Sequence, residues 1–299
     1  MGDNMHILSP FVVYMLVMIG IGVFYARTSH EHSDNYFLGG RSLGPWITAM
    51  SAEASDMSGW LLMGLPGVAY WCGIADAAWT AIGLAIGTYV NWLVVARRLR
   101  SYSIVAGDAI TIPEFFSNRF KEKKKAILMI AALFILIFFT VYAASCFVTC
   151  GKLFSTLFGF DYKLMMLLGA LIVILYTLLA GFLAESASDF IQAIVMIVAL
   201  VVIFGMGTAA AGGFDRITEN VKDIPGFLSF FGIAQPEVVD GAQQIVNGAP
   251  VFGAAGTYGL ISILSCLAWG LGYFGMPQVL LRFMAIRTAG EIKKSRRIA

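Results

Sequence analysis

Seven long apolar runs divide this chain, and they restrict what it can fold into more than any other feature. Each run is about 20 residues long or longer, which is the length that a helix needs to cross the hydrocarbon core of a bilayer. The sequence therefore predicts an all-α integral membrane protein with about seven transmembrane helices. The runs lie near 7–26, 45–70, 73–96, 126–150, 163–184, 190–211 and 254–284.

The composition agrees with a membrane protein and excludes several classes of function. Of the 299 residues, 59% are hydrophobic and only 13% are charged, whereas about a quarter of the residues of a soluble domain are charged. The formal net charge of +2 is too small to suggest a nucleic-acid partner. No Walker A loop or other catalytic motif is present. We therefore expect the lipid bilayer as a partner, no nucleic acid and no enzymatic activity.

The basic residues predict the orientation of the chain. Seven spans place the two termini on opposite sides, and segments rich in Lys and Arg stay in the cytoplasm. With the N-terminus outside, the outer segments carry only Lys152, Lys163, Arg216 and Lys222. The cytoplasmic segments then carry the other sixteen basic residues, namely Arg27, Arg41, Arg97, Arg98, Arg100, Arg119, Lys121, Lys123, Lys124, Lys125, Arg282, Arg287, Lys293, Lys294, Arg296 and Arg297.

Two of the loops between the runs are long. Residues 97–125 contain the stretch EFFSNRFKEKKK, for which a short amphipathic helix and a solvated basic loop are equally good interpretations. Residues 212–253 form an acidic loop with an aromatic patch, GFLSFFGI, that can lie at the membrane interface.

The second run carries carboxylates where a membrane span is expected. In AEASDMSGWLLMGLPG, residues 52–67, Glu53 and Asp56 lie beside serines, glycines and a proline. An Asp at the centre of a membrane helix costs about 2.5–3.5 kcal/mol on insertion scales, so it normally faces an ion or substrate path. An interrupted helix also leaves carbonyl groups unpaired, and a bound cation can satisfy them. A simple Gly/Pro kink with a hydrogen-bonded Asp is the alternative.

The seventh run is interrupted as well. LAWGLGYFGMPQVL, residues 267–280, contains three glycines and a proline. Trp269 and Tyr273 are one α-helical turn apart, so they are expected to share a face and to line a pocket, although ordinary packing or an interfacial belt explains such a pair too.

The spacing of the two interrupted runs suggests a function. The seventh run follows the second by five spans, so it crosses the membrane in the opposite direction. Two Gly/Pro-interrupted segments in corresponding positions of inverted halves point to the midplane site of a secondary transporter. Residues 1–299 then form one transmembrane domain, with a leading span at 7–26, a first five-helix repeat at 45–211 and the first helix of a second repeat at 254–284. Four helices of the second repeat are absent, so we interpret the chain as the N-terminal portion of a longer transporter.

Five stretches give the chain a resemblance to a known family. Taken in chain order, these stretches resemble the sodium:solute symporter family, and SDMSGWLLMGLPG at 55–67 resembles its proline-transporting branch. The resemblance implies an inverted-repeat LeuT-type fold with thirteen spans and an outside N-terminus. It also implies sodium-coupled uptake of L-proline across the bacterial cytoplasmic membrane. The stretches are GGRSLGP (39–45), SDMSGWLLMGLPG (55–67), FFTVYAAS (138–145), GFLAESASDFIQA (181–193) and WGLGYFGMPQVLLRFMA (269–285).

The resemblance implies the site residues too. The sodium site would use the backbone carbonyls of Ala54 and Met57, with Asp56 and Ser58 supporting or contributing, and its other half would lie on a later helix. Sodium is a hard cation that suits oxygen ligands, and aromatic faces suit the cationic amine and apolar ring of proline. The proline pocket would involve Gly59, Trp60, Tyr142, Trp269, Tyr273 and Pro277.

Two further carboxylates bear on this site. Glu53 stands where a small residue is expected from the family, and it adds a carboxylate near the sodium path. Asp189 matches an acidic position of the family, but SASD at a helix start is also a typical N-cap. We favour the cap.

Three alternative functions stay open. The same architecture can carry another small solute, or a proton can replace sodium, with Asp56 or Glu53 titrating. The chain can also be the transporter-like input module of a membrane sensor kinase. Uptake with sodium replaced by choline tests the coupling ion, and the downstream reading frame tests the sensor.

Overall fold

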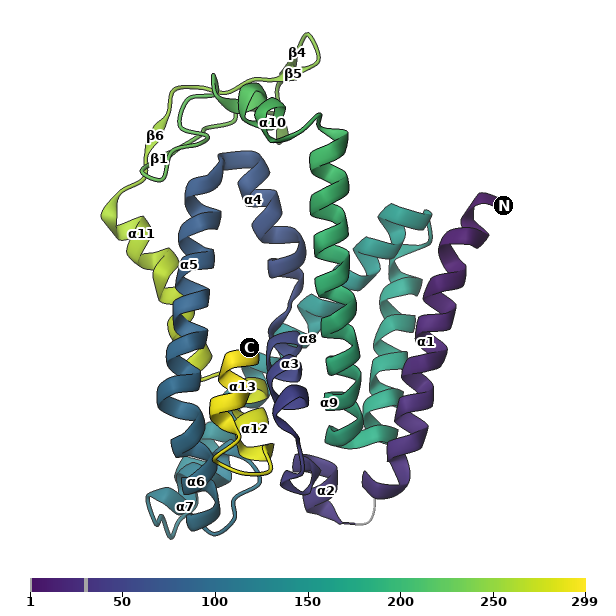
Figure 1. Ribbon diagram of the computed structural model, residues 1–299, viewed down its shortest axis with the longest axis vertical. Coiled ribbons are helices and arrows are strands. Elements are labelled where there is room, and N and C mark those ends of the chain that lie inside the picture. Colours follow the sequence, from purple (N-terminus) through teal and green to yellow (C-terminus); the bar gives the residue numbers. More distant parts are fainter. Residues whose placement is uncertain (1, 30–31) are drawn as a thin grey trace. The chain divides into compact units, whose positions relative to one another are not determined.

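The computed structural model describes residues 2–29 and 32–299, and most of these residues are helical (Figure 1). The α-helices are α1 (Gly2–Ser29), α2 (Ser33–Leu38), α3 (Pro45–Asp56), α4 (Leu65–Cys72), α5 (Ile74–Asn91), α6 (Arg97–Val105), α7 (Ile112–Arg119), α8 (Ala126–Phe158), α9 (Tyr162–Ala210), α10 (Phe214–Val221), α11 (Leu260–Leu267), α12 (Pro277–Ala285) and α13 (Ile292–Ile298). Four shorter helical segments are η1 (Gly39–Arg41), η2 (Trp60–Gly64), η3 (Trp92–Ala96) and η4 (Ala268–Phe274).

Each of the seven predicted spans falls on an apolar helix or on a broken one. Among the described residues, three helices are long and apolar enough to cross a membrane alone, at Ile74–Val105, Ala126–Phe158 and Gly181–Ala210. Leu260–Phe274 and Pro277–Ala285 qualify as one span bent by 43°. The first, second and fifth predicted spans overlap with the shorter apolar helices Val12–Ala26, Trp60–Cys72 and Tyr162–Leu178.

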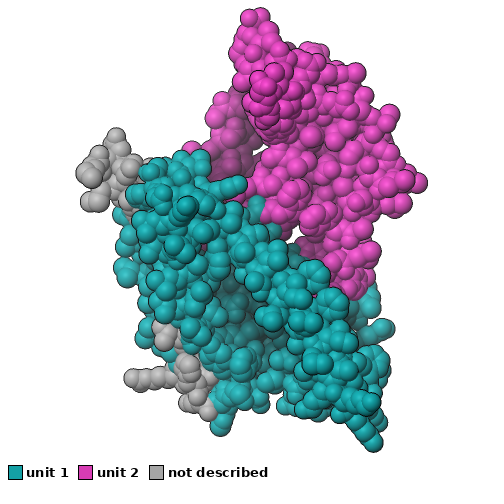
Figure 2. All heavy atoms as spheres, turned by 180° about the vertical axis from the view of Figure 1, so that it is seen from behind, with its two compact units in different colours: residues 1–59, 92–193, 276–299 teal, residues 60–91, 194–275 magenta. Residues whose placement is uncertain are grey.

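The chain divides into two compact units, and the division passes through both interrupted spans. Unit 1 consists of residues 1–59, 92–193 and 276–299, and unit 2 of residues 60–91 and 194–275 (Figure 2). Each interrupted span therefore contributes one half to each unit. Unit 1 contains α3 and α12, and unit 2 contains η2, α4, α11 and η4.

The breaks predicted in the two spans are confirmed, and their backbones are alike. α3 ends at Asp56, and Met57 after it is extended, with φ −70° and ψ 108°. In the seventh span Met276 precedes α12 with φ −76° and ψ 109°. Pro277 then takes the first position of α12, where its missing N–H removes no helical hydrogen bond.

The fifth and sixth spans meet at a kink inside α9, and this corrects the role expected for Asp189. The backbone at Gly181 has φ 63° and ψ −172°, a conformation that favours glycine. The helix resumes there, so Asp189 lies well inside it. The N-cap interpretation of SASD is therefore wrong, because the actual start of the helical segment is two turns earlier.

The basic segment at 97–125 contains the helices α6 and α7, which confirms the short helix rather than an irregular loop. α7 starts at a cap in which Thr111 Oγ1 accepts a hydrogen bond from the Glu114 N–H at 3.3 Å. The Glu114 carboxylate in turn accepts one from the Ile110 N–H at 3.0 Å. This reciprocal arrangement resembles a capping box.

The long loop after α9 lies in unit 2 and contains α10 and three short antiparallel strand pairs. Its aromatic patch is attached to the α4–α5 turn, since the Ile74 N–H donates to the Phe227 carbonyl at 2.9 Å. The Trp79 indole N–H donates to the Phe230 carbonyl at 2.9 Å. The strands are β1 (Gly232–Ile233) with β6 (Gly256–Thr257), β2 (Val238–Val239) with β3 (Ala242–Gln243), and β4 (Ile245–Val246) with β5 (Ala249–Pro250).

Candidate functional site

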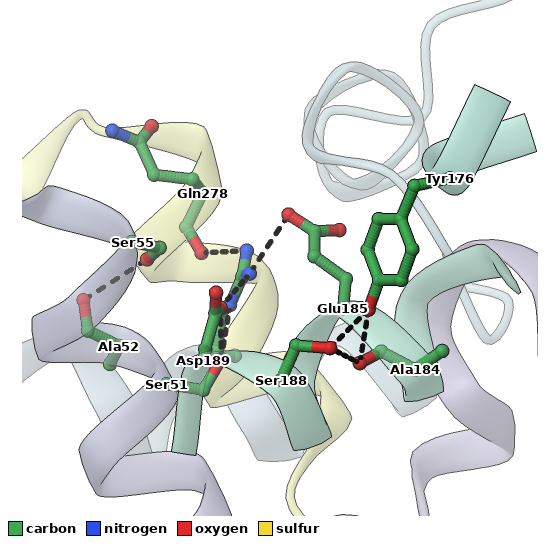
Figure 3. A network of polar contacts seen from close by, with 10 residues as sticks. Ser51, Ala52, Ser55, Tyr176, Ala184, Glu185, Ser188, Asp189 and Gln278 are labelled. Carbon is green, nitrogen blue, oxygen red and sulfur yellow. Dashed lines mark hydrogen bonds and ion pairs between the residues drawn. The ribbon is translucent and has the colours of Figure 1, made fainter. Parts of the chain in front are cut away.

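In unit 1, the half-spans α3 and α12 are joined by a buried arginine. Arg282 of α12 is 2% exposed. Its Nε donates to Ser51 Oγ of α3 at 3.0 Å, and its Nη2 donates to Asp189 Oδ2 of α9 at 2.9 Å. The same nitrogen lies 3.2 Å from Glu185 Oε1 (Figure 3). One guanidinium therefore ties the three helices α3, α9 and α12 together.

The buried cation of this network has its counterion within the same unit. A buried cation needs a paired and hydrogen-bonded counterion to be tolerated, and Asp189 supplies it at a side-chain exposure of 13%. Ser51 Oγ also donates to Asp189 Oδ2 at 2.8 Å, so the carboxylate has two partners. The guanidinium carbon lies 5.0 Å from the centre of the Phe182 ring. The arrangement is a polar cluster in which Arg282 is buried and Glu185, at 42% side-chain exposure, lies at the edge.

Sequence reasoning did not find this cluster. The positive-inside rule places Arg282 among the cytoplasmic basic residues, and no local motif links it to Ser51 or Glu185. The signal that could have found it is an arginine inside the apolar stretch VLLRFMA, because a charge at membrane depth normally has a partner.

The break in the second span lies against α8 within unit 1. A Cβ added to Gly59 would lie 2.5 Å from Thr149 Oγ1 and 2.7 Å from Thr149 Cγ2, so only glycine allows this approach. Tyr142 precedes Thr149 by seven residues, which places both on the same side of α8. Unit 1 thus brings the sequence-predicted Gly59 to the α8 face that carries Tyr142.

The residues expected to bind sodium form the end of α3 and the two residues after it. All of residues 53–58 are half-buried. The Ala54 carbonyl accepts a hydrogen bond from the Met57 N–H at 3.2 Å, and a carbonyl oxygen has a second lone pair. Glu53 Oε1 lies 3.5 Å from the Trp92 indole nitrogen, which donates to it. Carbonyl, hydroxyl and carboxylate oxygens therefore lie within one short segment, and this oxygen chemistry fits a hard cation.

In unit 2, the aromatic residues expected around the substrate are only partly brought together. The Trp60 and Trp269 rings are stacked, with centroids 5.6 Å apart and an interplanar angle of 5°. Trp269 is 49% exposed, whereas Tyr273 is 8% exposed. The expectation that Trp269 and Tyr273 share a helical face is wrong, because η4 is a 3₁₀-helix in which residues four apart point about 120° from each other.

The six residues expected in the substrate pocket are divided equally between the units. Gly59, Tyr142 and Pro277 belong to unit 1. Trp60, Trp269 and Tyr273 belong to unit 2. Pro277 begins α12, Gly59 and Trp60 follow the first break, Tyr142 lies on α8, and Trp269 and Tyr273 lie in η4.

Two interrupted membrane helices in corresponding positions are typical of secondary transporters. Comparison with known proteins identifies the family. The model of the sodium:solute symporter family matches residues 36–299, and this chain belongs to that family. It is an all-α multi-pass membrane protein of the LeuT-type fold.

Individual relatives narrow the comparison further. The osmoregulated proline transporter OpuE of Bacillus subtilis (strain 168) is 42% identical over 295 residues, covering 99% of this chain and 55% of that protein. The sodium/proline symporter of Staphylococcus aureus (strain USA300) is 41% identical over 287 residues, covering 96% of this chain and 51% of that protein. The chain thus spans about half the length of the curated relatives that it matches.

A solved structure supports the fold at lower sequence similarity. It is the substrate-bound outward-open state of a Na⁺-coupled sialic acid symporter, which this chain matches with a TM-score of 0.74 at 18% identity. The match covers 96% of this chain and 55% of the symporter chain.

Proposed function

We propose that this protein is a symporter that uses the sodium gradient to take up L-proline. The observation that carries the proposal is the similarity, at 41–42% identity and across both interrupted spans, to proteins named as a proline transporter and a sodium/proline symporter. Transport of this kind needs no covalent chemistry, so we expect no enzymatic activity.

The break in the second span supports sodium as the coupling ion. Sodium would be held by the carbonyls of Ala54 and Met57, with Asp56 and Ser58 contributing oxygens. The carboxylate of Asp56 would add a strong attraction in a site partly removed from water. A cation bound across the break would fix the second span in one arrangement, and substrate would then meet a preformed site.

The aromatic residues near both breaks support proline as the substrate. The stacked rings of Trp60 and Trp269 offer flat apolar surface for the pyrrolidine ring, and aromatic faces attract a cationic amine. Tyr142, Tyr273, Gly59 and Pro277 complete the proposed pocket. Backbone N–H groups at a helix start suit the carboxylate of the amino acid.

The distribution of basic residues supports an orientation in a bacterial cytoplasmic membrane. The N-terminus would lie outside and the C-terminal segment in the cytoplasm. α3 and α12 then form the cytoplasmic halves of the interrupted spans, and α4 and α11 the outer halves.

Uptake of labelled proline by the complete product of the gene, reconstituted in proteoliposomes, tests the function. We expect accumulation with an inward sodium gradient and none when choline replaces sodium. Accumulation driven equally well by a proton gradient alone would instead establish the proton-coupled alternative. If another unlabelled solute inhibited this uptake more strongly than unlabelled proline does, that solute would be the preferred substrate. Absence of any gradient-driven uptake would favour the sensor module.

A further inference from the structure

One face of α5 is shaped to hold the 3₁₀ segment of the seventh span within unit 2. Gly83, Gly87 and Asn91 follow one another at intervals of four residues, so they lie on one side of the helix. A Cβ on Gly83 would lie 2.7 Å from Leu267 Cα. A Cβ on Gly87 would overlap with the backbone of Gly270. The two backbones thus approach as closely as glycine permits, as small residues allow in membrane helix pairs.

Asn91 adds a hydrogen bond at the end of this close contact. Asn91 is 1% exposed, and its Nδ2 donates to the Tyr273 carbonyl at 2.9 Å. The last carbonyls of a helix lack partners within the helix, so this side-chain amide supplies one where η4 ends. Asn91 therefore contacts the backbone of the residue whose ring is proposed to cover substrate.

A role in packing alone does not explain an asparagine at this position. Within the described chain, Asn91 Oδ1 is buried without a hydrogen-bond partner. An apolar residue of similar volume would fill the space without leaving a buried acceptor unpaired. The one contact that requires an amide is the donation to Tyr273.

We propose that Asn91 is a positioning residue for substrate binding. Together with the close contact at Gly83 and Gly87, it fixes the end of η4 and so sets where Tyr273 stands. This inference rests on the proposed transport of proline, and it adds a residue of α5 that contacts the binding segment through its backbone only.

The test is the uptake assay on Asn91→Leu, which keeps the branched shape and the number of heavy side-chain atoms and removes the donor. We expect the half-saturating proline concentration to rise about three- to tenfold, as for one lost hydrogen bond. The half-saturating sodium concentration and the maximal rate should stay within about twofold of the parent protein. Thr88→Val, which removes a hydroxyl one turn away on α5, serves as the matched control and should change neither constant.

Asn91→Asp gives a second and independent readout. An ionised carboxylate cannot donate to the Tyr273 carbonyl, whereas a protonated one can, and buried carboxyl groups protonate at higher pH than exposed ones. The proline defect, measured relative to the parent protein, should therefore shrink from pH 7.5 to pH 5.5. This comparison decides the question if Asn91→Leu does not reach the membrane.

The outcomes separate this inference from the proposed function. If Tyr273→Ala raises the half-saturating proline concentration but both Asn91 variants leave it unchanged at all pH values, the positioning role is wrong and proline transport stands. If the parent protein shows no sodium-dependent proline uptake, the proposed function itself fails. Equal losses for proline and for sodium would reduce Asn91 to a structural residue and overturn the inference.

Discussion

In unit 1 the halves of the interrupted spans are joined by a charged hydrogen-bond network. In unit 2 they are held by stacked rings and by close packing of the backbone on α5. α3 and α12 meet through the guanidinium of Arg282, which bonds Ser51 and Asp189. In unit 2, η2 and η4 meet through the stacked rings of Trp60 and Trp269. η4 also lies against glycines of α5.

The difference predicts opposite sensitivities. A charged network fails when atoms are removed, because the remaining partner is left buried without compensation. A contact between backbones fails when atoms are added, because close-packed helices have no space for them. Substitutions that remove atoms should therefore weaken mainly the contacts of unit 1, and substitutions that add atoms should weaken mainly those of unit 2.

The largest effect is expected from Arg282→Met. Removal of the guanidinium leaves Asp189 without its counterion, and breaking a buried pair costs about 3–5 kcal/mol. The melting temperature of the detergent-solubilised variant should therefore lie well below that of the parent protein. Glu185→Gln is the matched control, since Glu185 is 42% exposed and Asp189 still pairs with the arginine. A melting temperature unchanged in Arg282→Met would show that charge does not hold α3 to α12.

Asp56→Asn tests the break of the second span itself. Loss of a carboxylate from a partly desolvated cation site is expected to cost about 2–3 kcal/mol, which raises the half-saturating sodium concentration about 100-fold. Sodium-dependent proline uptake at varied sodium measures this. Asp76→Asn is a matched control on α5, because its side chain keeps an acceptor for Tyr258, which donates to Asp76 at 2.9 Å. Equal sodium dependence of the two variants would remove Asp56 from the site.

Gly87→Val probes the shape contact by adding atoms. The new side chain would collide with the backbone of Gly270, which we expect to destabilise the protein by about 1–3 kcal/mol. Ala85→Val adds the same kind of bulk on the exposed side of α5 and should be nearly neutral. The melting temperatures of both variants give the comparison. If the two shifted alike, the close approach of α5 and η4 would not matter for stability.

The smallest effect is expected for the tryptophan pair. A double-mutant cycle of Trp60→Ala and Trp269→Ala should give a coupling free energy of about 0.5–1.5 kcal/mol, as measured for aromatic pairs. Half-saturating proline concentrations of the two single variants and the double variant give the value. A coupling near zero would mean that the stacked rings act on substrate independently.

Sequence patterns predicted both breaks because glycine and proline act locally on the backbone at each of them. They did not predict the cluster around Arg282, since its partner Asp189 lies 93 residues away on another helix. The cap signal of SASD failed because the helix already resumes at Gly181, eight residues before Asp189. The 3₁₀ winding of η4 was missed because an α-helical period was assumed for Trp269 and Tyr273.

The short strands were within reach of sequence reasoning. The turns of two hairpins are Asp240-Gly241 and Asn247-Gly248, and all four residues have positive φ. Asp-Gly and Asn-Gly between short apolar pairs are strong hairpin signals. Neither the acidic charge nor the aromatic patch of the loop indicates strands, and the interpretation of the loop rested on those two features.

The hairpin formed by β4 and β5 also gives an experimental handle. Every residue from Ile245 to Pro250 is exposed, while the part of the loop attached to the α4–α5 turn lies earlier, at Phe227 and Phe230. A peptide epitope inserted between Asn247 and Gly248 would therefore extend an exposed turn without touching that attachment. Antibody added to intact cells would then report directly which side of the membrane this loop faces.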